Sequence, residues 1–72
     1  MNERDLENFY REHLEEDIIF YLSEHLHISL EKAMHMYYMS ELSERIYQGE
    51  GDIQYLSYRL LAQMVEKELL DK

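Results

Sequence analysis

The chain has 72 residues with no cysteine, no proline and no tryptophan, and only two glycines. Without cysteine there is neither a disulfide framework nor a thiolate metal site, which favours a reducing compartment. Without proline, and with so little glycine, few positions interrupt a helix. A chain of this length has room for one small core, so we expect residues 1–72 to form a single helical domain.

Long apolar runs and a basic N-terminal segment are also missing. The longest apolar run is residues 18–22, far shorter than a membrane span. The first residues lack the basic start and apolar stretch of a secretory signal. We therefore expect a soluble, cytoplasmic protein.

Positive charge is scarce, because 16 acidic residues outnumber 7 basic ones and the net charge is −9. Residues 1–17 alone hold seven acids and two arginines. A negative field repels phosphate backbones and anionic lipids, so direct binding of nucleic acid or membrane is disfavoured, whereas a basic protein partner is attracted. The alternative is that the acidic surface serves only solubility.

The hydrophobic residues recur at steps of three and four, which is the helical period. A first helix is predicted from about residue 3 to 26, with Asn2 as its N-cap. The pattern leaves open a break near Glu15 and Glu16, which would make residues 1–16 a peripheral N-terminal helix. After Ile18 the apolar stripe widens, since Ile19 and Phe20 add a second face, so the second half is expected to be buried more fully.

Capping residues divide the rest of the chain. Ser29 is the expected N-cap of a second helix, and Ser40 or Ser43 caps a third unless the second continues. Gly49 is a plausible C-cap, and Asp52 is expected to begin the last helix.

No segment shows sustained period-two alternation, so strands are not expected. The predicted fold is all-α, a small bundle of three to four helices that dimerisation would complete. Its predicted core comprises Leu14, Ile18, Tyr21, Leu22, Leu26, Ala33, Met34, Tyr37, Leu42, Ile46, Leu56, Leu60, Leu61 and Met64.

Metal and catalytic chemistry find little support. Glu24 and His27 have the Glu-x-x-His spacing of di-metal bundles, but those bundles need two such motifs and two further carboxylates. The pairs His13–Asp17 and Glu31–His35 are more typical of surface contacts. The sequence around Gly49 lacks the strand and lysine of a phosphate loop. We expect no cofactor, no metal and no enzymatic activity.

The unusual feature is the content of seven tyrosines and five methionines. Residues 34–39 hold three methionines and two tyrosines, more than a small core can hide, and such residues are favoured at protein interfaces. The alternative is that these tyrosines and methionines belong to the core and to one rim of aromatic side chains beside it. The predicted protein-binding residues are Met36, Tyr38, Met39, Glu12, Glu15 and Glu16.

Several segments are similar to those of a known family. The runs Asp17–Ile19, Tyr21–Leu26, Ile28–Met34 and Tyr37–Ser40, followed later by Tyr55-Leu56, resemble a family of small acidic helical bacterial proteins of unknown function. Members of such families are often encoded beside putative toxins, some resembling ADP-ribosyltransferases. The resemblance implies an antitoxin or accessory binding role, and it carries over no site residues.

The leading hypothesis is a non-enzymatic protein-interaction module, antitoxin-like or accessory, whose partner is basic. One alternative is an acidic mimic of nucleic acid that inhibits a DNA- or RNA-binding protein, which requires carboxylates in phosphate-like rows. A second alternative is a metal-binding helical bundle.

Overall fold

The computed structural model describes the backbone of residues 3–70 and the side chains of residues 9–49, 51, 53 and 55–70. It contains four α-helices, α1 (Glu3–Leu26), α2 (Leu30–Met39), α3 (Glu41–Gln48) and α4 (Tyr58–Leu70), and a 3₁₀ helix, η1 (Glu50–Tyr55). The described residues form no strand, which confirms the all-α bundle. The expected cap Asn2 lies outside the described residues.

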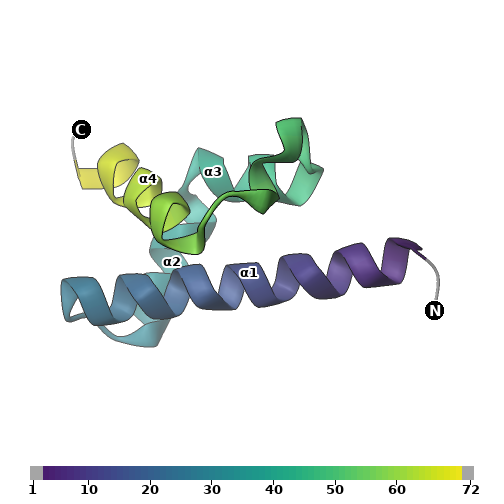
Figure 1. The fold of residues 1–72 in the computed structure, drawn as a ribbon. Helices are drawn as coiled ribbons and strands as arrows, with labels where there is room; N and C mark the ends of the chain where they lie inside the picture. Colours follow the sequence, from purple (N-terminus) through teal and green to yellow (C-terminus); the bar gives the residue numbers. More distant parts are fainter. Residues whose placement is uncertain (1–2, 71–72) are drawn as a thin grey trace.

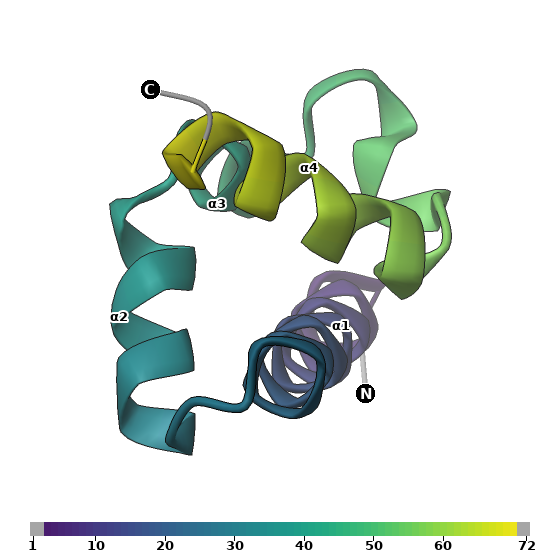
Figure 2. The same cartoon turned by 90° about the vertical axis from the view of Figure 1, so that its left-hand side faces the viewer.

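Helix α1 is a long rod on which the other helices assemble (Figure 1). Its 24 residues give it a length of about 36 Å at 1.5 Å per residue. The helix runs without interruption from Glu3 to Leu26, so of the two alternatives that the sequence leaves open near Glu15 and Glu16, the continuous helix is the one formed. Figure 2 looks along α1 and shows α2 running across it, with α3 and α4 completing the enclosure.

Serine side chains and one glycine with a left-handed backbone conformation mark the helix ends that the sequence predicts. The Ser29 hydroxyl accepts from the Lys32 N–H at 3.0 Å and caps α2. Ser40 ends α2 and begins α3, with its hydroxyl accepting from the Ser43 N–H at 3.2 Å. Gly49 has φ +68°, the left-handed conformation that glycine adopts easily, and it ends α3.

The start of the last helix differs from the prediction. Asp52 lies inside η1 and does not cap α4. At the end of η1, the Leu56 N–H donates a hydrogen bond of 3.1 Å to the Ile53 carbonyl. The backbone is extended at Leu56. Ser57 caps α4, since its hydroxyl accepts from the Arg59 N–H and its carbonyl from the Leu61 N–H.

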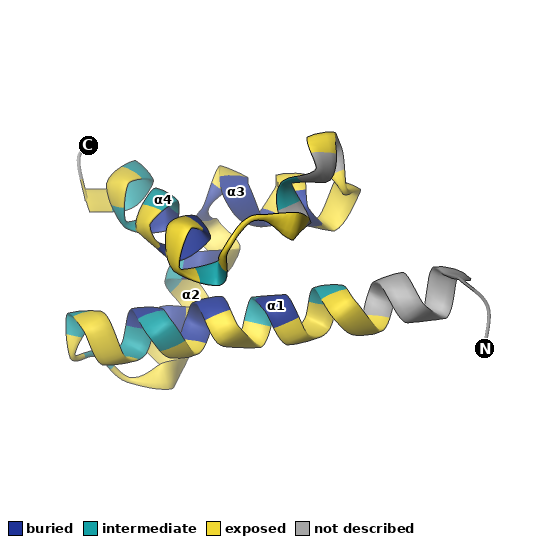
Figure 3. Cartoon of the chain, in the orientation of Figure 1, coloured by how far each residue is buried: buried dark blue, intermediate teal, exposed yellow. Residues whose placement is uncertain are grey.

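The core lies where the four helices meet (Figure 3). Its fully buried large side chains are Ile18, Leu22, Tyr37, Ile46, Leu61 and Val65. Eight of the predicted core residues are buried, and Tyr21, Leu26 and Met64 pack partly against them. Ile19, which the sequence places on the second apolar face of α1, is buried, whereas Ala62 and Val65 are buried without having been named in the predicted core.

Four positions were predicted wrongly as buried. Leu56 is exposed because it lies in the connection before α4, and Leu60 is exposed because it is about 100° around the helix from the buried Leu61. Met34 is about 100° from the buried Ala33 in the same way. Phe20 is exposed although the second half of α1 was expected to be buried on two faces.

Candidate protein-binding surface

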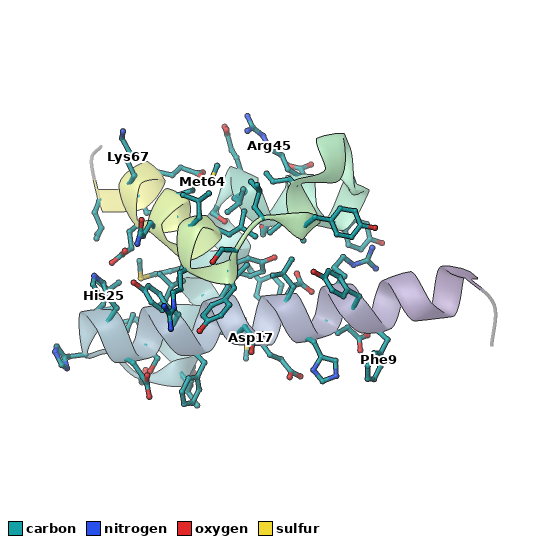
Figure 4. All side chains as sticks on the ribbon, viewed as in Figure 1. Phe9, Asp17, His25, Arg45, Met64 and Lys67 are labelled. Carbon is teal, nitrogen blue, oxygen red and sulfur yellow. The ribbon has the colours of Figure 1, made fainter. Side chains whose placement is uncertain are left out.

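The side of α1 turned away from the core carries a mixture of aromatic rings and carboxylates. At about 100° per residue, seven exposed side chains lie on the side of the helix opposite the buried Ile18. We call this set the outer face of α1: Phe9, Glu12, His13, Glu16, Asp17, Phe20 and Glu24. The predicted binding residues Glu12 and Glu16 belong to it and lie four residues apart. Figure 4 shows Phe9 projecting away from α3 and α4.

The two phenylalanines of the outer face are strongly exposed, Phe9 at 57% and Phe20 at 54%. The Phe9 ring meets the His13 ring edge-on, with centroids 4.4 Å apart. Within the part of the chain that the structure describes, no hydrogen bond or ion pair engages the carboxylates of the outer face. These groups are therefore available to a partner.

Glu15, the third predicted acidic residue, has an internal role. The Tyr37 hydroxyl donates a hydrogen bond of 2.8 Å to Glu15 Oε2, between α2 and the half-buried edge of α1. Burial raises the pKa of Tyr37 far above its ordinary value, and the hydrogen bond to Glu15 raises it further. The structure thus separates Glu15 from Glu12 and Glu16.

The predicted residues of α2 do not share one face. Met36 is half-buried, whereas Tyr38 and Met39 are exposed. Met36 and Tyr38 point about 200° apart around the helix. Tyr38 instead continues a flank formed by Leu30 and Met34, both exposed, at four-residue spacing. Desolvation and then the charge of Glu15 raise the pKa of Tyr38 above its ordinary value.

A groove of about 310 Å³ lies between α1 and the segment that joins η1 to α4. We call it the tyrosine groove, and its lining residues are Tyr10, His13, Leu14, Asp17, Tyr55, Leu56, Ser57 and Tyr58. The Tyr10 and Tyr55 rings, from α1 and η1, have centroids 5.9 Å apart and are tilted by 45°. His13 and Asp17 belong both to the groove and to the outer face, so the two surfaces are continuous.

Contacts behind the groove hold Tyr58 in place. The Tyr21 ring meets the Tyr58 ring edge-on at 6.1 Å and stacks on His25 at 5.3 Å. His25 Nε2 lies 3.6 Å from Glu66 Oε1 of α4. These contacts connect α4 to α1, and they hold Tyr58, which forms one wall of the tyrosine groove.

The histidines do not converge on a metal ion. Among the described residues, no three histidine, aspartate or glutamate side chains gather closely enough to hold one. His27, which shares the Glu-x-x-His spacing with Glu24, follows the end of α1 with φ +56°. His25 faces α4 through Glu66, on another element.

Sequence reasoning missed the groove although it noted the tyrosines. Tyr10, Tyr55 and Tyr58 come from three elements, and only the late start of α4 leaves Tyr55 outside a helix face. The available signal was the tyrosine-leucine pair, Tyr55-Leu56, which begins four residues after Gly51. That pair sits where the chain turns and was read as part of a helix.

In the described residues, no helix combines the length and the hydropathy that crossing a membrane requires. Comparison of the chain with protein-family models, with curated proteins and with solved structures gave no match.

Proposed function

We propose that this protein is a non-enzymatic interaction module that binds a basic protein through the outer face of α1. The observation that carries the proposal is the exposure of Phe9 and Phe20 among carboxylates without internal partners. The two rings are eleven residues apart, about three turns, so they lie in one line along the helix. An exposed apolar row with charged borders is typical of a surface that a partner covers.

The net charge of the whole of α1 indicates the chemistry of that partner. Residues 3–26 contain eight acids and two arginines, a net charge of −6 out of −9 for the whole chain. Lysine and arginine beside an apolar row would match this pattern and speed association. A basic amphipathic helix that lays its apolar side along Phe9 and Phe20 is the simplest such ligand.

The resemblance noted in the sequence supports an antitoxin-like or accessory version of this function in the cytoplasm. That version requires a basic toxin as the partner, and co-expression of this chain would then relieve growth arrest. The nucleic-acid mimic gains less support, because Glu15, Glu66 and Glu68 are engaged by Tyr37, His25 and the Glu41 N–H. The metal-binding bundle gains none from the described histidines.

The test is a calorimetric titration with a basic amphipathic peptide of about 18 residues, long enough to form a helix. A scrambled peptide of equal charge and an acidic counterpart serve as ligand controls. We expect Phe9→Ala and Phe20→Ala each to weaken binding about tenfold, which equals about 1.4 kcal/mol. Tyr47→Ala, an exposed aromatic on α3 outside both binding surfaces, is the matched control. Equal affinity for the ordered and scrambled peptides would reject the proposal.

Self-association remains a separate prediction. The flank of Leu30, Met34 and Tyr38 supports it, because residues 30–39 contain one glutamate and one lysine and so carry no net charge. A two-fold antiparallel pairing of α2 centred on Met34 would bring each Leu30 to the partner's Tyr38. Because the chain has no cysteine, Met34→Cys should form a disulfide dimer, and Phe9→Cys should not. Sedimentation showing only monomer at high micromolar concentration would reject the dimer.

A further inference from the structure

The tyrosine groove has features that neither folding nor the outer face explains. Tyr10 is 48% exposed and Tyr55 is 65% exposed, although their rings lie next to each other. A ring pair formed only to stabilise the fold would be expected to exclude water more fully. The groove instead keeps the two rings accessible beside the exposed carboxylate of Asp17.

The groove lining favours a cation with many hydrogen-bond donors. Aromatic faces attract cations, and the Asp17 carboxylate supplies the counter-charge. The hydroxyls of Tyr10, Tyr55 and Ser57 can accept hydrogen bonds. Leu14 provides apolar surface for an aliphatic stem. Ligand pockets start at about 300 Å³, so the groove has room for one side chain rather than a large cofactor.

Arginine satisfies these features better than lysine does. Its guanidinium is planar, carries five donors and no acceptor, and stacks on aromatic rings. The molecule already uses this contact twice, with Arg59 5.8 Å from the Tyr58 ring centroid and Arg11 4.9 Å from that of Tyr47. The fixed position of Tyr58 against Tyr21 provides part of the binding geometry in advance.

We propose that the tyrosine groove is a subsite for one arginine side chain of the basic partner. The guanidinium would lie against the Tyr10 and Tyr55 rings with the Asp17 carboxylate as its counter-ion. This inference rests on the proposed function, since Asp17 and His13 join the groove to the outer face. A partner helix along Phe9 and Phe20 would therefore extend one arginine into the groove.

The experiment is a two-dimensional NMR titration with N-acetylarginine amide, N-acetyllysine amide and N-acetylcitrulline amide. It uses low salt and about pH 8, above the range in which imidazoles usually take up protons. The arginine probe is expected to shift the resonances of Tyr10, Asp17 and Tyr55. The lysine probe should bind several-fold more weakly, and citrulline, a neutral near-isostere, should produce no saturable shift.

Variants assign the contact to the groove. We expect Asp17→Asn and Tyr55→Ala each to weaken the arginine probe about fivefold to tenfold. The matched controls are Glu31→Gln, an exposed carboxylate of α2 outside the groove and the outer face, and Tyr47→Ala, an exposed tyrosine of α3. Circular dichroism of each variant confirms that the helices remain.

The outcomes separate this inference from the proposed function. If the basic peptide binds and depends on Phe9 and Phe20, but the arginine probe leaves the groove unshifted, the subsite is rejected and the interaction function stands. If the arginine probe binds in the groove while the ordered and scrambled peptides bind alike, the subsite stands and the outer-face function fails. Equal effects of Glu31→Gln and Asp17→Asn would reject the subsite as nonspecific charge attraction.

Discussion

Helix α1 places a carboxylate next to tyrosine on each of its two flanks, with opposite results. On the flank toward α2, Glu15 accepts a 2.8 Å hydrogen bond from Tyr37, which is fully buried. On the flank toward η1 and α4, Asp17 lies beside the exposed rings of Tyr10 and Tyr55 in an open groove. The same pair of residue types is a structural contact on one side and lines an open groove on the other.

The difference comes from what packs above each pair. Tyr37 belongs to a full α-helix that crosses α1 and buries the Tyr37 ring, while Glu15 stays half-buried. Tyr55 belongs to the end of a short 3₁₀ helix, which covers α1 incompletely and leaves a groove. Burial strengthens the hydrogen bond between Tyr37 and Glu15. The polar groups of Asp17 and Tyr55, which no helix of the described residues covers, stay accessible to a partner.

The two flanks should differ most in how much their tyrosine side chains contribute to the free energy of unfolding. Tyr37→Ala should lower the free energy of unfolding by about 3–5 kcal/mol, because it leaves a cavity among the core helices. A core this small supplies only a few kcal/mol, so the variant should be largely unfolded. Tyr55→Ala should stay within about 0.5 kcal/mol of the parent. Urea unfolding followed by circular dichroism measures both values, and comparable losses would show that the groove tyrosine is structural.

A second contrast appears at alkaline pH. Burial and the Glu15 hydrogen bond raise the pKa of Tyr37 above the ordinary value of 10.0. Above pH 10.0 the unfolded chain releases this proton while the folded chain keeps it, so the unfolded state binds fewer protons and stability falls as pH rises. The slope approaches about 1.4 kcal/mol per pH unit for this one group.

Tyr37→Phe removes that proton and should flatten the alkaline loss relative to the parent. Denaturation midpoints measured at intervals on both sides of pH 10.0 give the two slopes. Tyr10→Phe, in the open groove, should retain the parent's slope. If Tyr37→Phe and the parent lose stability equally, Tyr37 does not keep its proton in the folded state.

At neutral pH the Tyr37→Phe change isolates the hydrogen bond itself. The ring still fills the core, but Glu15 loses its donor, and we expect a loss of about 1 kcal/mol. Tyr10→Phe should be neutral within about 0.5 kcal/mol, because no hydrogen bond engages the Tyr10 hydroxyl among the described residues. Thermal unfolding resolves the difference, since 1 kcal/mol moves the midpoint by about 4–8 °C in a domain of this size. Equal midpoints for the two variants would remove the structural role of the Glu15 contact.

The sequence predicted the flank of α1 that packs against α2 better than the flank that borders the tyrosine groove. The helical period identified Ile18, Leu22 and Tyr37 as core residues, and Ser29, Ser40 and Gly49 as helix ends. These features are local, because capping groups and one-sided stripes act within a few residues of chain. The pairing of Glu15 with Tyr37 was not predicted, since it depends on the angle at which α2 crosses α1.

The groove escaped prediction for a similar reason. The helix expected after Asp52 would have placed Tyr55 and Leu56 on an α-helix surface, whereas η1 ends at Tyr55 and holds that ring across from Tyr10. A choice between a 3₁₀ helix and the first turn of an α-helix rests on small energy differences that tertiary contacts decide. Exposed rings such as Phe20 also follow the helical period and look like core in a sequence.

The smallest expected changes in stability are those of substitutions at Asp17 and Glu15. They test the comparison between the two flanks of α1 most directly. Asp17→Asn should leave stability within about 0.5 kcal/mol of the parent, since its carboxylate has no internal partner in the described structure and the change relieves some self-repulsion in a chain of net charge −9. Glu15→Gln should cost about 0.5–1 kcal/mol, because a neutral amide oxygen is a weaker acceptor for Tyr37.

In binding of N-acetylarginine amide the order should reverse, with Asp17→Asn weakened and Glu15→Gln equal to the parent. The two isosteric substitutions lie two residues apart on one helix and remove the same charge, so neither net charge nor helix propensity explains a reversal. Urea unfolding and the NMR titration on the same pair of variants supply the four measurements. Two variants that behave alike in both would mean that α1 does not divide its flanks between folding and recognition.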